Sequence, residues 1–160
     1  MAVFNRICSK LPAKLLMIGD GPERSRIEQE CRESEYADHI RFLGKLEAVE
    51  EILSIGDLFV LPSESESFGL SALEAMACQV PVISSNTGGL PEVNINGVTG
   101  YMSNVGDVDD MAEHALKILK DDTLLSDFKS RALKQASNFD IGKILPAYIK
   151  LYQHVIHQHQ

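Results

Sequence analysis

Short apolar runs alternate with amphipathic stretches along most of the chain. Runs such as AKLLMIG (13–19) and DLFVLPS (57–63) are mostly apolar and end at glycine or serine, which is typical of strands buried on both faces of a parallel sheet. Between these runs, apolar residues recur at the spacing of one helix face. The pattern predicts strands at 13–19, 39–44, 57–63, 81–85 and near Tyr101, and helices at 24–34, 47–55, 69–77, 107–120, 123–138 and 141–157.

The first residues of the chain also have helical spacing. Residues 3–11 place their apolar side chains on one helix face, no N-cap residue precedes them, and Pro12 is expected to end the helix. This abrupt start indicates a chain cut from a larger protein. Because strands alternate with helices, we predict an α/β fold: one doubly wound, Rossmann-like parallel sheet with helices on both faces and a helical C-terminus. The length suits a single domain over residues 1–160.

The composition argues against several classes of protein. Apolar residues make up 44% of the chain and charged residues 24%, which is typical of a folded, soluble protein. The formal charge of −8, without a basic block, argues against a nucleic-acid partner. No apolar run approaches the roughly 20 residues that span a bilayer, and no signal sequence precedes the first helix, so we expect a cytoplasmic protein without a transmembrane segment.

Cysteine and histidine do not form a metal-binding pattern. Cys8, Cys31 and Cys78 are widely spaced and set among apolar residues, which is typical of reduced core thiols. The histidines within His154–His159 lie in a glutamine-rich terminus, which favours a frayed helix end over a metal site. We therefore predict neither a metal nor a cofactor.

The predicted topology indicates where a ligand would bind. In doubly wound folds, ligands bind outside the carboxyl ends of the strands. The loops at those ends are Gly19–Glu23, Leu43–Lys45, Ser63–Gly69 and Ser85–Glu92. The last of them is equally consistent with a simple turn and with a ligand contact.

The third loop, within SESESFGL (63–70), carries the strongest candidate chemistry. A helix is expected to begin near Phe68, so the free N–H groups of Phe68, Gly69 and Leu70 would offer a partial positive charge to a phosphate or sugar oxygen. Gly69 would let the ligand approach the backbone closely. Glu66 precedes this helix, where its carboxylate can accept hydrogen bonds from sugar hydroxyls.

Glu74 lies in the same predicted helix and is surrounded there by apolar residues. On a helical wheel it falls about 40° from Leu70 and between Ala77 and Cys78. A carboxylate there needs a partner, and the two hydroxyl groups of a ribose would supply one. The alternative stays open that Glu66 is only a favourable charge at a helix start and that Glu74 is a solvated surface residue.

Together these segments resemble a known family. Glu66 and Glu74 with SFG between them, followed by EAMACQVPVISSNTGGLPEV and NGVTGY, look like the C-terminal, donor-binding domain of the retaining glycosyltransferases of family 4 (group 1), which have the two-domain GT-B fold. GDGPE, FLGK and GDLFVLPSESESFG extend the resemblance, which covers about residues 13–121. Within the family, the chain most resembles the branch that joins N-acetylglucosamine to L-malate.

The resemblance implies a reaction and a set of roles. Enzymes of this family transfer a sugar from a nucleotide-sugar donor, here a UDP-sugar, to an acceptor with retention of the anomeric configuration. Glu66 resembles the catalytic residue at the transferred sugar, and Glu74 resembles the residue that holds the nucleotide ribose. The other donor contacts implied are the N–H groups of Phe68, Gly69 and Leu70 at the sugar and diphosphate, the backbone of Leu43, Gly44 and Lys45 at the base, and Gly19 beside the phosphates.

The chain also departs from the family pattern. The resemblance implies that the first strand of the domain, the Arg and Lys that follow it, and the N-terminal acceptor domain are all absent, so we expect the isolated chain to be inactive. Gln79 stands where the family usually has glycine, and a left-handed turn there would add roughly 1–2 kcal/mol of strain. Two alternatives remain: a nucleotide-sugar epimerase of the same architecture, and a non-catalytic α/β binding module.

Overall fold

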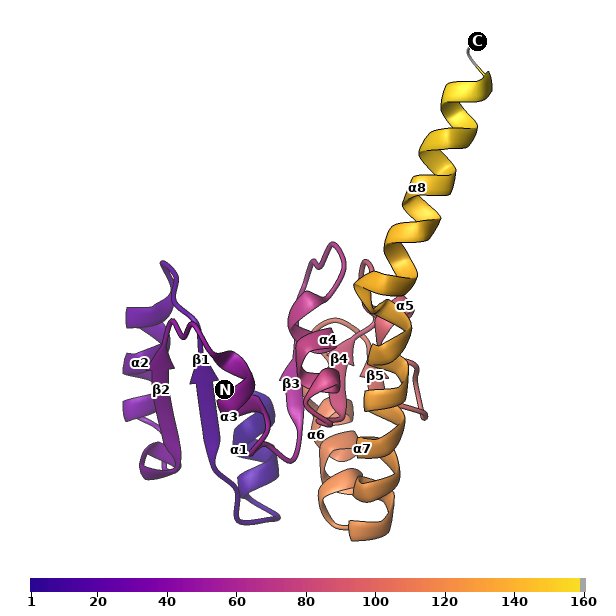
Figure 1. Ribbon diagram of the computed structural model, residues 1–160. Helices are drawn as coiled ribbons and strands as arrows, with labels where there is room; N and C mark the ends of the chain where they lie inside the picture. The colour runs from indigo at the N-terminus through magenta and orange to yellow at the C-terminus, as the bar shows by residue number, and fades with distance from the viewer. Residues whose placement is uncertain (159–160) are drawn as a thin grey trace.

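The computed structural model describes residues 1–158 as strands that alternate with helices (Figure 1). The strands are β1 (Leu15–Ile18), β2 (Ile40–Gly44), β3 (Phe59–Leu61), β4 (Val82–Ser85) and β5 (Gly100–Ser103). The helices are α1 (Ala2–Cys8), α2 (Arg24–Arg32), α3 (Val49–Leu53), α4 (Leu70–Ala77), α5 (Leu90–Val93), α6 (Val108–Leu119), α7 (Asp122–Ala136) and α8 (Ile141–Gln158), with the 3-10 turns η1 (Ala37–His39) and η2 (Ser137–Phe139).

The described strands are all parallel, but they form two sheets instead of the single sheet that we predicted. β1 pairs with β2, and β3, β4 and β5 pair in that order. In the larger sheet, Phe59 is level with Val82, and Val82 is level with Gly100. Within residues 1–158 no hydrogen-bonded ladder joins β1 to β3. The predicted α/β class with parallel strands is confirmed, and the hydrogen-bonded ladders divide these strands into two sheets.

Helices cover both faces of the larger sheet. On β4, Val82 packs in one cluster with Met76 of α4, whereas the next residue, Ile83, packs in another cluster with Met111 and Ile118 of α6. Successive residues of a strand point to opposite faces, so α4 lies on one face and α6 on the other. α7 contributes residues to both clusters. This double burial explains why residues 81–85 show no polar alternation.

Helix α1 lies against residues of both sheets. Its Phe4 packs in a cluster with Leu15 of β1, whereas Val3 and Ile7 pack in the cluster that includes Val60 of β3. These three α1 side chains are each less than 9% exposed. The uncapped N-terminal helix is therefore held by packing, because no side chain caps its first turn.

Two features of the chain differ from the predicted boundaries. α1 ends at Cys8, and the N–H groups of Lys10 and Leu11 both donate to the carbonyl of Ile7 at 2.9 Å in a final turn before Pro12. α5 lies inside the segment that we treated as a loop. Its first turn contains Pro91, where a missing N–H removes no helical hydrogen bond.

The turn after α4 is left-handed at Gln79, as we considered from the sequence. Gln79 has a φ of 62°. Its N–H donates to the carbonyl of Met76 at 3.0 Å, and the N–H of Val80 donates to the carbonyl of Ala75 at 2.9 Å. These two bonds form the Schellman motif that commonly ends a helix, and Val80 is buried beside it.

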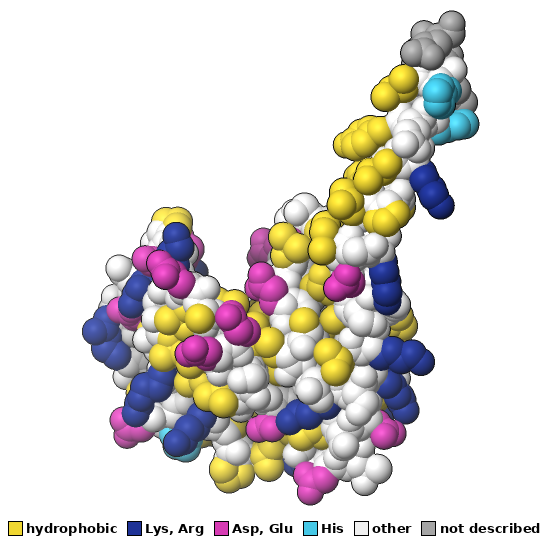
Figure 2. Space-filling model, in the orientation of Figure 1, with side chains coloured by type: hydrophobic (Ala, Val, Ile, Leu, Met, Phe, Trp, Pro, Cys, Tyr) yellow, Lys and Arg dark blue, Asp and Glu magenta, His cyan; other side chains and the backbone are white. Residues whose placement is uncertain are grey.

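Helix α8 projects away from the rest of the molecule and carries an apolar stripe that is visible on its surface (Figure 1, Figure 2). The apolar side chains of this stripe are 44% to 72% exposed. They are Ile141, Leu145, Tyr148, Ile149, Leu151, Tyr152, Val155 and Ile156. None of the helices within residues 1–158 has both the length and the apolar character to cross a membrane.

Candidate functional site

The loops that follow β1 and β2 meet at the carboxyl edge of the smaller sheet. The N–H of Gly19 donates to the carbonyl of Gly44 at 2.8 Å. Both glycines have positive φ, 122° and 69°, which side chains disfavour. No atom lies within 4 Å of the position that a β carbon on Gly19 would take, so this backbone is open to a ligand. Leu43 is half-buried beside Gly44, and Lys45 is exposed.

Arg24 also belongs to this edge, although its place there was not predicted from the sequence. Its Nη1 lies 3.4 Å from the position that a β carbon on Gly44 would take. Its Nε donates to Oε1 of Glu28 at 2.7 Å. The i, i+4 spacing of charges in GDGPERSRIE could have indicated the ion pair. It could not have indicated the contact with the second loop.

The loops that follow β3 and β4 pack backbone against backbone. The N–H of Gly89 donates to the carbonyl of Glu66 at 3.2 Å. A β carbon on Gly88 would overlap the same carbonyl oxygen, and one on Gly89 would lie 2.6 Å from the carbonyl oxygen of Ser67. Glycine at both positions is therefore required by this close approach. The sequence left this loop open between a turn and a ligand contact, and the packing supplies a structural reason for its glycines.

Glu66 is half-buried in the loop that precedes α4, and its Oε1 accepts a hydrogen bond from the N–H of Phe68 at 3.4 Å. Because α4 begins only at Leu70, the N–H of Phe68 is not one of the free helical donors that we predicted. Gly69 has a φ of 95° and is buried, and a β carbon there would lie 2.7 Å from Cδ2 of Leu90. Leu90 fills the space on this side of Gly69, and the ligand contact of Gly69 stays a prediction.

Glu74 lies on the exposed side of α4. The buried side is formed by Ala72, Ala75 and Met76, each 0% exposed, whereas Leu70 is 63% exposed. The predicted apolar environment of Glu74 is therefore wrong, because its neighbour on the helical wheel faces outward. Glu74 and the first N–H groups of α4 nevertheless belong to one short helix, and the carboxylate is accessible.

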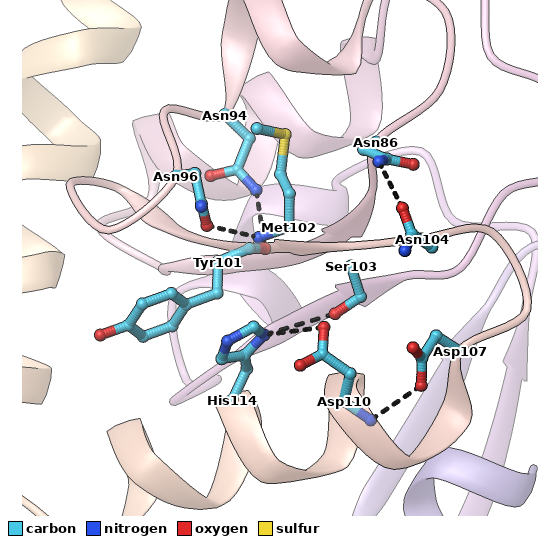
Figure 3. Close-up of polar contacts among 10 residues, drawn as sticks. All are labelled: Asn86, Asn94, Asn96, Tyr101, Met102, Ser103, Asn104, Asp107, Asp110 and His114. Carbon is cyan, nitrogen blue, oxygen red and sulfur yellow. Dashed lines mark hydrogen bonds and ion pairs between the residues drawn. The ribbon is translucent and has the colours of Figure 1, made fainter.

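Behind the fourth loop, a buried polar network joins the chain around β4 to β5; part of it is drawn in Figure 3. Nδ2 of Asn94 donates to Oγ of Ser84 at 2.9 Å and lies 3.2 Å from the carbonyl oxygens of Val82 and Tyr101. Oγ1 of Thr99 donates to Oδ1 of Asn94 at 2.9 Å. An unpaired buried polar group costs free energy, so these paired groups help to fix the chain that supports the loop. Asn94 belongs to the segment NING (94–97), whose composition is typical of a turn, so its role in a buried network could not be predicted from the sequence.

A serine, a histidine and an aspartate also lie together on β5 and α6, but they are not arranged as a catalytic triad (Figure 3). Nδ1 of His114 lies 3.3 Å from Oγ of Ser103 and 3.5 Å from Oδ2 of Asp110. In a triad the histidine uses one ring nitrogen for the serine and the other for the carboxylate. Here one nitrogen contacts both. The ring of Tyr101 stacks on the imidazole at 4.5 Å, so the cluster packs α6 onto the sheet.

The described residues contain no group of three or more His, Cys, Asp or Glu side chains that could hold a metal ion. His159 lies outside the described residues. Cys8, Cys31 and Cys78 are free thiols. Burial raises the pKa of each, which favours the neutral thiol at neutral pH.

Comparison with known proteins places the chain near sugar-transferring enzymes. Residues 1–135 match the family model described as Glycosyl transferases group 1. The chain is 43% identical over 154 residues to the N-acetyl-alpha-D-glucosaminyl L-malate synthase of Bacillus anthracis, with 96% of this chain and 40% of that protein covered. It is 32% identical over 142 residues to the 2-deoxystreptamine N-acetyl-D-glucosaminyltransferase of Niallia circulans, with 87% and 36% covered.

Solved structures share the fold. The chain superposes on the pneumococcal O-GlcNAc transferase GtfA, solved in complex with UDP and GlcNAc, with a TM-score of 0.86 and 21% identity. The superposition covers 98% of this chain and 32% of that one. The chain therefore spans 40% or less of the length of each of these proteins.

Proposed function

Because the chain belongs to the group 1 glycosyltransferases, we propose that it binds the nucleotide-sugar donor of an enzyme that transfers a sugar from a UDP-sugar to an acceptor with retention of configuration. The observation that carries the proposal is the position of Gly19, Gly44 and Glu66 at or beyond the carboxyl ends of parallel strands, where α/β folds bind nucleotides. The UDP and GlcNAc bound to GtfA, and the N-acetylglucosaminyl group in both relatives' names, favour UDP-N-acetylglucosamine.

The chemistry of this reaction matches the start of α4. The leaving group is a nucleoside diphosphate, so catalysis depends on stabilising negative charge on the departing phosphate. The first turn of α4, after Gly69, presents backbone N–H groups and the positive end of the helix dipole. We assign the diphosphate to this turn. We assign the transferred sugar to Glu66, whose carboxylate can stabilise the positive charge that develops at the anomeric carbon.

The other end of the donor fits the remaining residues. Glu74 lies roughly 7 Å beyond Gly69 along the helix axis, which suits a ribose that follows the diphosphate. Because Glu74 is exposed, its two oxygens are accessible to the two ribose hydroxyl groups. Gly19 is assigned to the phosphates, and Leu43–Lys45 is assigned to the base through its backbone.

Replacing Glu74 tests the assignment of the ribose. By calorimetric titration, we expect UDP to bind the chain and Glu74→Ala to raise its Kd by about tenfold, because a hydrogen-bonded carboxylate contributes about 1.5–3 kcal/mol. Glu113→Ala, which removes an exposed glutamate from α6, is the matched control and should bind UDP like the wild type. UDP binding that Glu74→Ala leaves unchanged would refute the ribose assignment. A wild-type chain that does not bind UDP would contradict the proposed donor.

We propose that transfer of the sugar to the acceptor requires a longer protein than this chain. The chain spans about two fifths of its relatives, and we place the acceptor site in the part that it does not include. We therefore expect no transfer of N-acetylglucosamine to L-malate when the chain is incubated with UDP-N-acetylglucosamine. Transfer of the sugar by these 160 residues alone would contradict this part of the proposal.

A further inference from the structure

Arg24 connects two of the loops that form the candidate site. Its backbone N–H donates to the carbonyl of Gly21 at 3.1 Å and closes the GDGPE turn after β1. Its side chain reaches β2, where Nη1 lies 3.4 Å from the position of a β carbon on Gly44. Arg24 thus packs beside the hydrogen bond that joins Gly19 to Gly44.

Two carboxylates orient the guanidinium of Arg24. Nε donates to Oε1 of Glu28 at 2.7 Å, and Nη1 lies 3.7 Å from Oδ1 of Asp20. The hydrogen bond with Glu28 raises the pKa of Arg24, so the side chain stays charged. A guanidinium presents its donors in a rigid plane, whereas an ammonium group is a point charge on a flexible stem. The side chain is 38% exposed, so these two carboxylates hold it at the surface.

We propose that Arg24 is a positioning residue, which holds the turn Gly19–Gly21 and the segment Leu43–Lys45 in the relative placement that recognition of the nucleobase requires. The inference rests on the proposed function, because that function assigns the base to Leu43–Lys45. Backbone groups recognise a base only when they are held to within about 0.5 Å of the productive geometry. Gly44 has no side chain that could pack to fix its position, and the guanidinium of Arg24 lies next to the space that such a side chain would take.

The same helix offers a matched control. Arg26 also belongs to α2 and also has two acidic partners, Glu23 at 2.6 Å and Glu30 at 3.7 Å. Its side chain is 65% exposed, and its partners are all within or next to its own helix. Replacing Arg26 removes a comparable charge and comparable ion pairs without touching the loops.

Amide exchange tests the positioning role without a ligand. In Arg24→Ala, the N–H of Gly19 should exchange about tenfold faster, because its acceptor on Gly44 is no longer held in place. Arg26→Ala should leave this exchange rate within about twofold of the wild type. Arg24→Lys keeps the positive charge but loses the planar guanidinium, so its exchange rate at Gly19 should resemble that of Arg24→Ala. An unchanged rate at Gly19 in Arg24→Ala would overturn the inference.

Discrimination between bases tests the consequence for binding. The ratio of the Kd for ADP to the Kd for UDP should fall by about tenfold in Arg24→Ala and stay unchanged in Arg26→Ala. The ratio is used because a general loss of stability would weaken the binding of both nucleotides alike. A ratio that Arg24→Ala leaves unchanged would overturn the role in base recognition. A wild-type chain that binds neither nucleotide contradicts the proposed function instead, and the exchange rate at Gly19 then decides the positioning role alone.

Discussion

The two sheets are built from similar apolar strands but are packed very differently. In the half that contains β3, β4 and β5, the central strand β4 is buried throughout, with Val82 and Ile83 0% exposed and a helix on each face, whereas the outer strand β3 is half-buried. In the half that contains β1 and β2, Leu16 is 38% exposed and most other strand residues are only half-buried. An apolar run therefore identified a strand in both halves but did not show how deeply the strand is buried.

The candidate loops follow the same division. In the β3–β5 half, Gly88, Gly89 and Gly69 each face a neighbouring chain segment so closely that a β carbon would not fit without movement. In the β1–β2 half, Gly19 and Gly21 have open space around them. There the loops are joined by one backbone hydrogen bond and by Arg24. We infer that the sugar and diphosphate end of the proposed site is set by rigid packing, and the base end by a few surface contacts.

The largest expected contrast comes from adding one methyl group to a loop of each half. Gly88→Ala should destabilise the protein by about 4 kcal/mol, because the new β carbon would overlap the backbone of Glu66 and Gly88 has a φ of 55°. Gly21→Ala, with nothing within 4 Å of its β-carbon position, should change stability by less than about 1 kcal/mol. Urea unfolding of both variants measures the difference. Similar losses would remove the distinction between a packed and an open half.

A smaller contrast is expected when an apolar side chain is shortened in each sheet. Ile83→Ala should lower the free energy of unfolding by about 3 kcal/mol, because Ile83 is fully buried and its removal leaves a cavity. Leu16→Ala should lower it by about 1 kcal/mol, since this side chain already contacts water. The same unfolding experiment applies. A loss at Leu16 as large as the loss at Ile83 would show that the β1–β2 half is packed as tightly as the other.

The order of helices and strands could be predicted because it depends on local periodicity. Apolar runs such as residues 81–85 and helical spacing such as residues 107–120 are recorded in consecutive positions. The division into two sheets could not be predicted in this way, since periodicity marks a strand and not its neighbours. The short helix α5 was missed because four residues that contain Pro91 show no period.

The candidate site shows the same limit. The sequence placed Gly19, Gly44 and Glu66 at strand ends correctly, because that position follows from the element order. The surroundings of Gly69 and Glu74 could not be predicted. Leu90, which packs against Gly69, is distant in the sequence, and the exposed side of α4 depends on how the helix docks. Arg24 was missed for the same reason, since Gly44 belongs to another strand.

The smallest predicted effect tests whether the packed half also holds strain. Gln79→Gly should raise the free energy of unfolding by about 1 kcal/mol, because glycine adopts the φ of 62° without the clash of a β carbon. The buried Val80 and the two hydrogen bonds of the Schellman motif hold the turn in place, so glutamine is forced into this conformation. Gln79→Ala keeps the β carbon and should change stability by less than about 0.5 kcal/mol. Thermal and urea unfolding should both show that Gln79→Gly is more stable than the wild type. A loss of stability in Gln79→Gly would mean that the turn is not strained and that the extra freedom of glycine in the unfolded chain outweighs any relief.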